Sequence, residues 1–198
     1  MKICIDPGHG MSNRNKGIYD PGATHVENGF LFQEADIALS YALRLKEALL
    51  AKGFEVFMTR DDATDHTPVV QRARMAQDAG CDILISLHLN DVEDDSAQGV
   101  EVLYAREGSI SLAQAFQDAL VAATGFKDRH IKLRTELAVL KFNGNAVLIE
   151  LGFIGNDNNR NTLINAQKRS VITEAIANAV KNHTQSASVN LIDENKVA

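Results

Sequence analysis

The sequence is poor in cysteine: its 198 residues include only two, Cys4 and Cys81. Both lie in or beside apolar stretches, where a free cysteine usually serves as a small buried hydrophobic residue. Two cysteines do not make a disulfide framework. The chain must therefore be held together by an ordinary hydrophobic core, and its length is sufficient to form one within a single domain.

The sequence also lacks an excess of positive charge. Its 20 Lys and Arg residues are outnumbered by 26 Asp and Glu residues, which gives a formal net charge of −6 at pH 7. The chain shows no basic arm or basic patch, so we expect no nucleic acid partner. Simple electrostatic attraction to an anionic surface is disfavoured for the same reason.

Long apolar runs are missing as well. No stretch is long enough to span a bilayer, so we expect no integral membrane segment. The first residues form an apolar strand pattern at once and contain no charged-then-apolar export signal. We therefore expect a protein that is synthesised in the cytoplasm without a signal peptide.

Two histidines follow apolar stretches that are typical of buried strands. Residues 3–5 are rich in β-branched side chains and are followed by a Pro-Gly pair, which places His9 on a tight turn between two glycines. Residues 82–87 lead directly into His88. A lone histidine is most often an ordinary packed residue, but one at a strand end is well placed to face a cleft. The recurrence of the pattern favours a role as ligands.

A third apolar stretch, residues 145–149, ends on a carboxylate, Glu150. A Glu in apolar surroundings is costly unless it is paired, bound to a metal or functional. Functional sites in open α/β sheets assemble where the strands end, so His9, His88 and Glu150 predict a divalent metal site there, with zinc as the first candidate. Glu34 lies in the first turn of a predicted helix. It either complements the helix dipole or, if the helix starts above this edge, provides a third metal ligand.

The remaining sequence alternates between predicted strands and helices. Residues 11–29 are rich in Gly and Asn and predict a long loop, in which His25 and Glu27 are more simply solvated than functional. Arg72 and Arg74 are expected to be solvated or paired with acids. Helices are predicted over residues 32–52, 68–79, 111–123 and 162–182, further strands over 54–59 and 99–104, an extended segment over 137–141, a polar connector over 128–135 and a loop over 152–161.

This order predicts an α/β fold: a single domain with a mostly parallel twisted sheet of about six strands and helices on both faces. The domain is expected to cover residues 1–183. Residues 184–198 lack periodicity and are predicted to form a flexible C-terminal tail.

Four sequence segments carry a family resemblance. They are Asp6–Gly10 (DPGHG), Glu34–Leu39 (EADIAL), Ile85–Asn90 (ISLHLN) and Val147–Ile154 (VLIELGFI). In this order they resemble the zinc-dependent N-acetylmuramoyl-L-alanine amidases of the Amidase_3 type. The resemblance extends over residues 1–183. Four motifs in this order are more specific for the family than any one of them.

The resemblance implies a role for each matching residue. His9, Glu34 and His88 would bind Zn²⁺, and Glu150 would be the catalytic carboxylate that handles the proton of the attacking water. The substrate would be peptidoglycan, cut at the amide between N-acetylmuramic acid and the L-alanine of the stem peptide. Wall-targeting repeats and an export signal are missing, which is typical of a phage or prophage endolysin that acts on the cell wall after release or lysis. A cytoplasmic or mother-cell lytic enzyme is the alternative context.

Three other functions compete with this interpretation. A zinc peptidase that cuts within the stem peptide could use a similar ligand set. A non-catalytic peptidoglycan-binding module with a structural metal is a second alternative, although Glu150 argues against it. The third is a metal-free α/β protein whose histidines serve packing.

Overall fold

The computed structural model describes the backbone of residues 1–194 and the side chains of residues 1–185. The main sheet has six strands in the order β4-β1-β5-β8-β6-β7, and only the β6–β8 pair is antiparallel. This confirms the predicted fold class. The strands are β1 (Lys2–Pro7), β4 (Glu55–Met58), β5 (Ile83–Asn90), β6 (Val100–Tyr104), β7 (Asp128–Leu133) and β8 (Asn145–Phe153).

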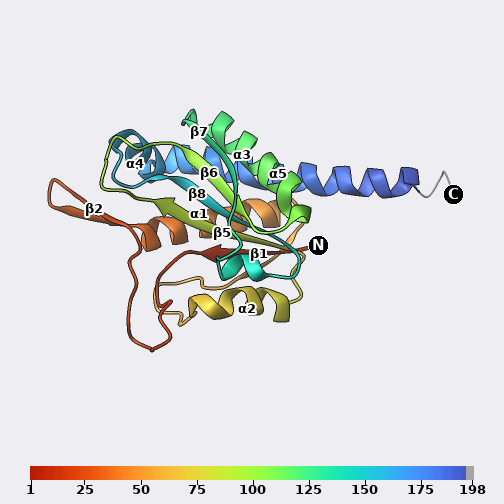
Figure 1. Cartoon of the computed structure of the whole chain (residues 1–198), viewed down its shortest axis with the longest axis horizontal. Helices are drawn as coiled ribbons and strands as arrows, with labels where there is room; N and C mark the ends of the chain where they lie inside the picture. Colours follow the sequence, from red (N-terminus) through yellow and green to blue (C-terminus); the bar gives the residue numbers. More distant parts are fainter. Residues whose placement is uncertain (195–198) are drawn as a thin grey trace.

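Helices cover both faces of this sheet (Figure 1). Helices α1, α3 and α5 pack on one face, and α2 with the short 3₁₀ turn η3 covers part of the other. The helical elements are α1 (Glu34–Ala51), η1 (Val69–Gln71), α2 (Arg72–Asp78), η2 (Glu107–Ser109), α3 (Ile110–Thr124), η3 (Val139–Lys141), α4 (Asp157–Ile164) and α5 (Ala166–Glu194).

The alternation of side chains along the strands separates a larger core from a smaller one. In β1, Ile3 and Ile5 pack into the larger core beneath α1, whereas Cys4 faces the smaller core beneath α2 and η3. Successive strand residues point to opposite faces, so the face of the smaller core continues toward the ends of the strands. There it becomes polar, at Asp6, Ser86, His88 and Glu150.

Two predicted irregular segments contain regular structure. The predicted loop 11–29 includes β2 (Thr24–Glu27), which pairs with β3 (Phe30–Gln33) in a hairpin before α1. The predicted connector 128–135 forms β7. This strand pairs only with β6 at the edge of the sheet, so most of its side chains are partly or fully exposed and its sequence lacks an apolar strand pattern.

Two further predictions of local structure were wrong. Residues 137–141 were predicted to be extended but contain the 3₁₀ turn η3, whose adjacent Val139 and Leu140 are both buried. The predicted loop 152–161 contains the start of α4. This helix is polar, and it begins where the Asn156 side chain accepts a hydrogen bond from the backbone N–H of Asn159.

Helix α5 continues to Glu194, beyond its predicted end at residue 182, and Figure 1 shows its C-terminal part extending past the body of the domain. The predicted tail 184–198 is therefore helical up to Glu194, and its last four residues lie outside the described part of the chain. Its flexibility stays a prediction. Across the described residues, no helix combines the length and apolarity that crossing a membrane requires.

Candidate metal centre and active site

The turn after β1 places His9 beside His88. The backbone of His9 has φ 59°, a left-handed conformation that is uncommon for residues with a side chain. A Cβ atom on Gly8 would lie 2.4 Å from Cε1 of His88, so only glycine fits where the two strands meet. The two imidazole rings consequently lie 4.9 Å apart, centroid to centroid, at an interplanar angle of 75°.

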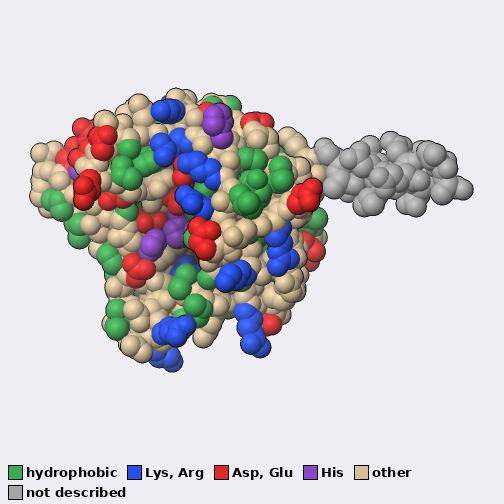
Figure 2. Space-filling model, in the orientation of Figure 1, with side chains coloured by type: hydrophobic (Ala, Val, Ile, Leu, Met, Phe, Trp, Pro, Cys, Tyr) green, Lys and Arg blue, Asp and Glu red, His purple; other side chains and the backbone are tan. Residues whose placement is uncertain are grey.

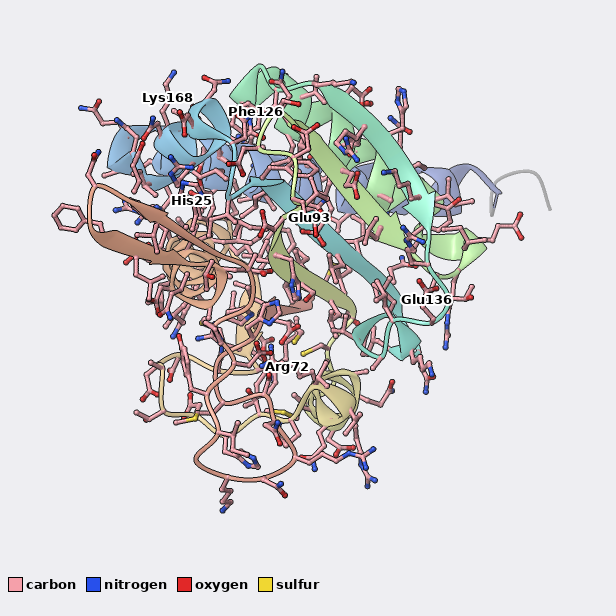
Figure 3. The ribbon with its side chains drawn as sticks, turned by 60° about the vertical axis from the view of Figure 1, so that its left-hand side comes forward. His25, Arg72, Glu93, Phe126, Glu136 and Lys168 are labelled. Atoms are coloured by element: carbon pink, nitrogen blue, oxygen red, sulfur yellow. The ribbon has the colours of Figure 1, made fainter. Side chains whose placement is uncertain are left out.

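Two buried arginines hold this turn through its carbonyl groups. Arg60 donates to the carbonyl oxygens of Pro7 at 3.0 Å and Gly8 at 2.7 Å. Arg72 donates to those of Pro7 at 2.6 Å and His9 at 2.5 Å, and it also pairs with Asp6 at 3.0 Å. Arg72 is labelled in Figure 3, between α2 and the N-terminal loop. Of the two environments expected for it, the structure shows pairing with an acid rather than solvation.

Glu34 begins α1 directly above the ends of β1 and β5. Its Oε1 atom lies 3.1 Å from Nε2 of His9 and 2.8 Å from Nδ1 of His88, and it accepts the backbone N–H of Leu89 at 2.9 Å. Its Oε2 atom accepts the backbone N–H of Ala23 at 2.8 Å. The condition for a third ligand, a helix start above the sheet edge, is therefore met.

The three side chains fit a zinc ion. One nitrogen from each of His9 and His88 and a carboxylate oxygen of Glu34 all lie within 4.8 Å of one another. Tetrahedral zinc with bonds of roughly 2.0–2.2 Å holds its ligand atoms about 3.3–3.6 Å apart, close to the 3.1 and 2.8 Å that separate Glu34 from the two imidazoles. Three protein ligands also match the number found in catalytic rather than structural zinc sites.

Asp20 supports His9 and is absent from the predicted site. Its Oδ2 atom accepts a hydrogen bond from Nδ1 of His9 at 2.9 Å and another from the Ser12 hydroxyl at 2.9 Å. Metal-binding histidines usually donate their second ring N–H to a carboxylate or carbonyl in this way. No sequence signal distinguishes Asp20 from its polar neighbours, because only the folding of the loop brings it to His9.

The two residues of this loop considered in the sequence analysis, His25 and Glu27, are not part of the cluster. His25 lies on β2 and is not one of the clustered ligands, and Figure 3 shows it apart from Arg72. Glu27 pairs with Arg160 at 3.1 Å. The structure thus gives neither residue a place among the candidate metal ligands.

The charges of the cluster favour a positive ion. Burial alone would lower the pKa of His9, but its hydrogen bonds and charge interactions with Glu34 and Asp20 outweigh burial and raise this pKa to about 9. Burial would raise the pKa of Glu34, but the hydrogen bonds with His88 and His9 hold it well below its usual range. His9 therefore holds a proton tightly beside the ionised carboxylate of Glu34, and a metal cation could take the place of this proton.

Glu150 lies on β8, where its backbone pairs with His88 of β5. Its Oε2 atom is buried and has no hydrogen-bond partner among the described residues. Burial raises the pKa of Glu150 to about 7, and the negative charges of Glu34 and Glu101 act in the same direction against the nearby histidines. A carboxyl group with this pKa can both accept and release a proton near neutral pH.

A cavity of about 180 Å³ opens beside the cluster, between the turn after β1 and η3. His9, Asp20 and His88 form its polar side, and Leu137 and Val139 form part of its apolar side. A larger cavity of about 660 Å³ lies between α3 and α5. Its lining is mostly alanine and contains none of the clustered ligands, so the smaller cavity is the one associated with the chemistry.

The fold and the cluster define an α/β protein with a candidate catalytic metal centre at the carboxyl ends of its central strands. The sequence profile of the Amidase_3 family, described as N-acetylmuramoyl-L-alanine amidase, matches residues 3–182. The chain belongs to this family. The predicted family is confirmed.

Individual relatives agree with this assignment. The chain is 32% identical over 179 residues to the N-acetylmuramoyl-L-alanine amidase CwlM of Mycobacterium tuberculosis, covering 83% of this chain and 44% of CwlM. It is 30% identical over 188 residues to the N-acetylmuramoyl-L-alanine amidase LytC of Bacillus subtilis, covering 93% of this chain and 35% of LytC. The chain thus spans less than half the length of either relative.

Solved structures of the same fold include two amidases. The catalytic domain of CwlV from Bacillus (Paenibacillus) polymyxa var. colistinus matches with a TM-score of 0.83 at 25% identity, covering 93% of this chain and 98% of that domain. The N-acetylmuramoyl-L-alanine amidase of Clostridium difficile 630 matches with a TM-score of 0.83 at 30% identity, covering 93% and 97%.

Proposed function

We propose that this chain is a zinc-dependent hydrolase that cuts the amide bond between N-acetylmuramic acid and L-alanine in peptidoglycan. The observation that carries the proposal is the His9–Glu34–His88 cluster, next to a carboxylate oxygen of Glu150 that has no hydrogen-bond partner among the described residues. Membership of the amidase family supports the choice of substrate.

His9, Glu34 and His88 are the proposed zinc ligands, and Asp20 orients His9 by accepting its second ring N–H. When bound, zinc supplies Lewis-acid activation of water and of the amide carbonyl. The buried Arg60 and Arg72 have a positioning role: they bind the carbonyl groups of the turn that presents His9. Glu34 serves as a ligand while two backbone N–H groups hold its carboxylate in place.

Glu150 is the proposed proton carrier. Its raised pKa and free Oε2 atom suit a carboxylate that accepts a proton from the attacking water. The same carboxyl group then donates this proton to the leaving nitrogen of L-alanine. The amide breaks into a lactyl carboxylic acid on the sugar and a free amine on the peptide, so one water is consumed and Glu150 returns to its ionised form.

Digestion of purified peptidoglycan tests the proposal. We expect intact glycan strands and free peptides that begin at L-alanine, detected by mass spectrometry. A chelator should abolish these products, and added zinc should restore them. Boiled protein and the Glu150→Gln variant provide the blanks.

The alternatives predict different products. Cleavage at a bond within the stem peptide, with the L-alanine still attached to the sugar, would identify the protein as a peptidase and not an amidase. Binding to peptidoglycan without any cleavage, by protein that contains zinc, would indicate a binding module. Full cleavage by chelator-treated protein that contains no metal would refute zinc dependence.

A lytic role similar to that of an endolysin is the proposed cellular context. The catalytic domain of the CD27L endolysin, described as targeting Clostridia difficile, shares the fold with a TM-score of 0.72 at 25% identity over 92% of this chain. The protein would be made in the cytoplasm and would act on the cell wall after release or lysis. Purified protein should then clear suspensions of bacteria with accessible walls. Cytoplasmic expression should lyse cells only when a membrane-permeabilising protein is expressed with it. Lysis without such a partner would contradict this context.

A further inference from the structure

A row of ionisable side chains crosses the sheet from the metal cluster to the edge strand β7. His88 on β5 pairs in register with Glu150 on β8, and Glu150 pairs in register with Glu101 on β6. Adjacent strands lie roughly 4.8 Å apart, so Glu101 lies about 10 Å from His88. The row ends with Arg129 and Lys132 of β7, which both contact Glu101.

Glu101 is buried and holds both cations. Its Oε2 atom accepts hydrogen bonds from Nε of Arg129 at 2.7 Å and from Nζ of Lys132 at 2.5 Å. Its Oε1 atom accepts one from Nδ2 of Asn90 at 3.1 Å. One carboxylate therefore pairs with two cations at this end of the row.

Both cations keep donors free for another anion. Arg129 uses only Nε for Glu101, and its two terminal nitrogens have no hydrogen-bond partner within the described part of the chain. Lys132 likewise makes only one of the three hydrogen bonds that an ammonium group can donate. The side chains are 31% and 35% exposed. A planar guanidinium with free terminal N–H groups is well suited to bind a carboxylate.

The position of Arg129 is fixed by two further contacts. Its guanidinium carbon lies 4.8 Å from the centre of the Phe153 ring, a cation–π arrangement. Arg129 also packs against Gly99, where a Cβ atom would lie 2.5 Å from the backbone oxygen of Lys127 and 2.8 Å from the Cγ and Cδ atoms of Arg129. Figure 2 shows Lys and Arg side chains gathered on the same face as histidine side chains, although the chain as a whole is acidic.

We propose that Arg129 and Lys132 form a subsite that binds a carboxylate of the peptidoglycan stem peptide. This inference rests on the proposed function and deepens it. With the scissile amide at the metal cluster, the peptide that follows L-alanine would cross Glu150 and Glu101 toward β7. The free carboxylates of the stem peptide lie beyond L-alanine, on the second and third residues and at the C-terminus, and we place one of those on the second or third residue at the two cations.

The test uses synthetic muropeptides that all have an amidated C-terminus and differ only in the amidation of the second and third stem residues. One carries free carboxylates on the second and third stem residues, two are amidated at one of these positions, and one is amidated at both. The unmodified protein should cleave all four at L-alanine and have the lowest KM for the substrate with the matching free carboxylate. Arg129→Gln and Lys132→Gln should each raise that KM about 10-fold, change kcat little, and leave the KM of the doubly amidated substrate unchanged.

Arg134→Gln is the matched control, because Arg134 follows β7, is exposed and lies 3.9 Å from Glu136. It should alter no KM. Arg129→Lys keeps the positive charge but loses the paired terminal N–H groups of the guanidinium. Its KM should therefore lie between those of the unmodified protein and Arg129→Gln. The two singly amidated substrates identify which carboxylate is bound.

Three results would overturn the subsite. One is equal KM values of the unmodified protein for free and amidated substrates, and another is an equal rise for all substrates in the variants. The third is a loss of kcat alone, which would show that the cations act only through Glu101. If no substrate is cleaved at L-alanine, the proposed function fails first and the subsite fails with it.

Discussion

Glu34 and Asp20 contact opposite nitrogens of the same imidazole, and together they determine how His9 titrates. Their effect exceeds that of burial and raises the pKa of His9 to about 9, above its ordinary value of 6.5. A group with a raised folded-state pKa stabilises the fold fully below the unfolded pKa, and this stabilisation is lost as the pH rises through the folded pKa. For His9 the loss falls between pH 6.5 and about 9.

Zinc should therefore displace a proton from His9, because an imidazole must be neutral to bind a metal. We predict the release of about one proton per zinc at pH 7.5, measured by titration calorimetry in two buffers of different ionisation enthalpy. The metal-free protein should lose stability from pH 6.5 to 9, whereas the zinc-loaded protein should not. Glu150→Gln should leave the proton release in place. Zinc binding with no buffer dependence would show that His9 is not the ligand that titrates.

Asp20 should matter for metal affinity even though it is not a ligand. In Asp20→Asn the side chain keeps its size but loses the charge that orients the His9 ring. We expect zinc affinity to fall about 10- to 100-fold, measured by competition with a chromogenic chelator. Ser12→Ala removes a hydrogen bond to the same oxygen and should have a smaller effect. Equal affinities in Asp20→Asn and the parent protein would remove Asp20 from the metal centre.

Glu150 can be separated from the ligands by its effect on turnover. Glu150→Gln should retain stoichiometric zinc, measured by mass spectrometry of the metal, and lose roughly 10²- to 10⁴-fold in kcat. His9→Ala and His88→Ala should lose the metal itself. Glu136→Gln changes an exposed acid outside the site and should be neutral. Loss of zinc in Glu150→Gln would make Glu150 a ligand instead.

At the scale of elements, the strands that build the site could be predicted because each is a buried apolar run that ends on a ligand-type residue. His88 and Glu150 are adjacent in register because parallel strands β5 and β8 are neighbours in the sheet. Strand β7 was missed because its edge position requires no apolar pattern. Arg129 and Lys132 were missed with it, since only the pairing of β7 with β6 brings them to Glu101.

The turn that presents His9 depends on α2 through one buried side chain. Arg72→Ala would leave Asp6 buried without its cation and would remove a donor from four backbone or hydroxyl acceptors. We predict a loss of about 3–5 kcal/mol in the free energy of unfolding, measured by urea denaturation. Arg74 lies on the same helix with 82% of its side chain exposed and pairs only with Asp78. Arg74→Ala should stay within about 0.5 kcal/mol of the parent, and a similar cost for both variants would contradict the role given to Arg72.

At the scale of the whole molecule, the two faces of the sheet have different roles: one packs against the larger core, and the other carries the candidate site. The face packed against α1, α3 and α5 is apolar along the full length of the central strands. On the opposite face, α2 and η3 cover only the first part of the central strands. Nearer the carboxyl ends of the strands, this face carries the metal cluster, Glu150 and the charged row to β7. The family assignment covers residues 3–182, so it includes every element that contributes to either face.

The same division predicts where the chain can be shortened. The buried side chains of α5 include Ile172, Ile176 and Val180, and none of the described residues after Val180 is buried. A chain that ends at Gln185 should therefore keep its metal and its activity, and its free energy of unfolding should change by no more than about 0.5 kcal/mol. Ile176→Ala in the full chain should instead cost about 2–5 kcal/mol, because it opens a cavity in the larger core. Urea denaturation compares the two variants directly. A large loss on truncation would show that the C-terminal part of α5 belongs to the folded domain, and the predicted boundary after residue 183 would be wrong.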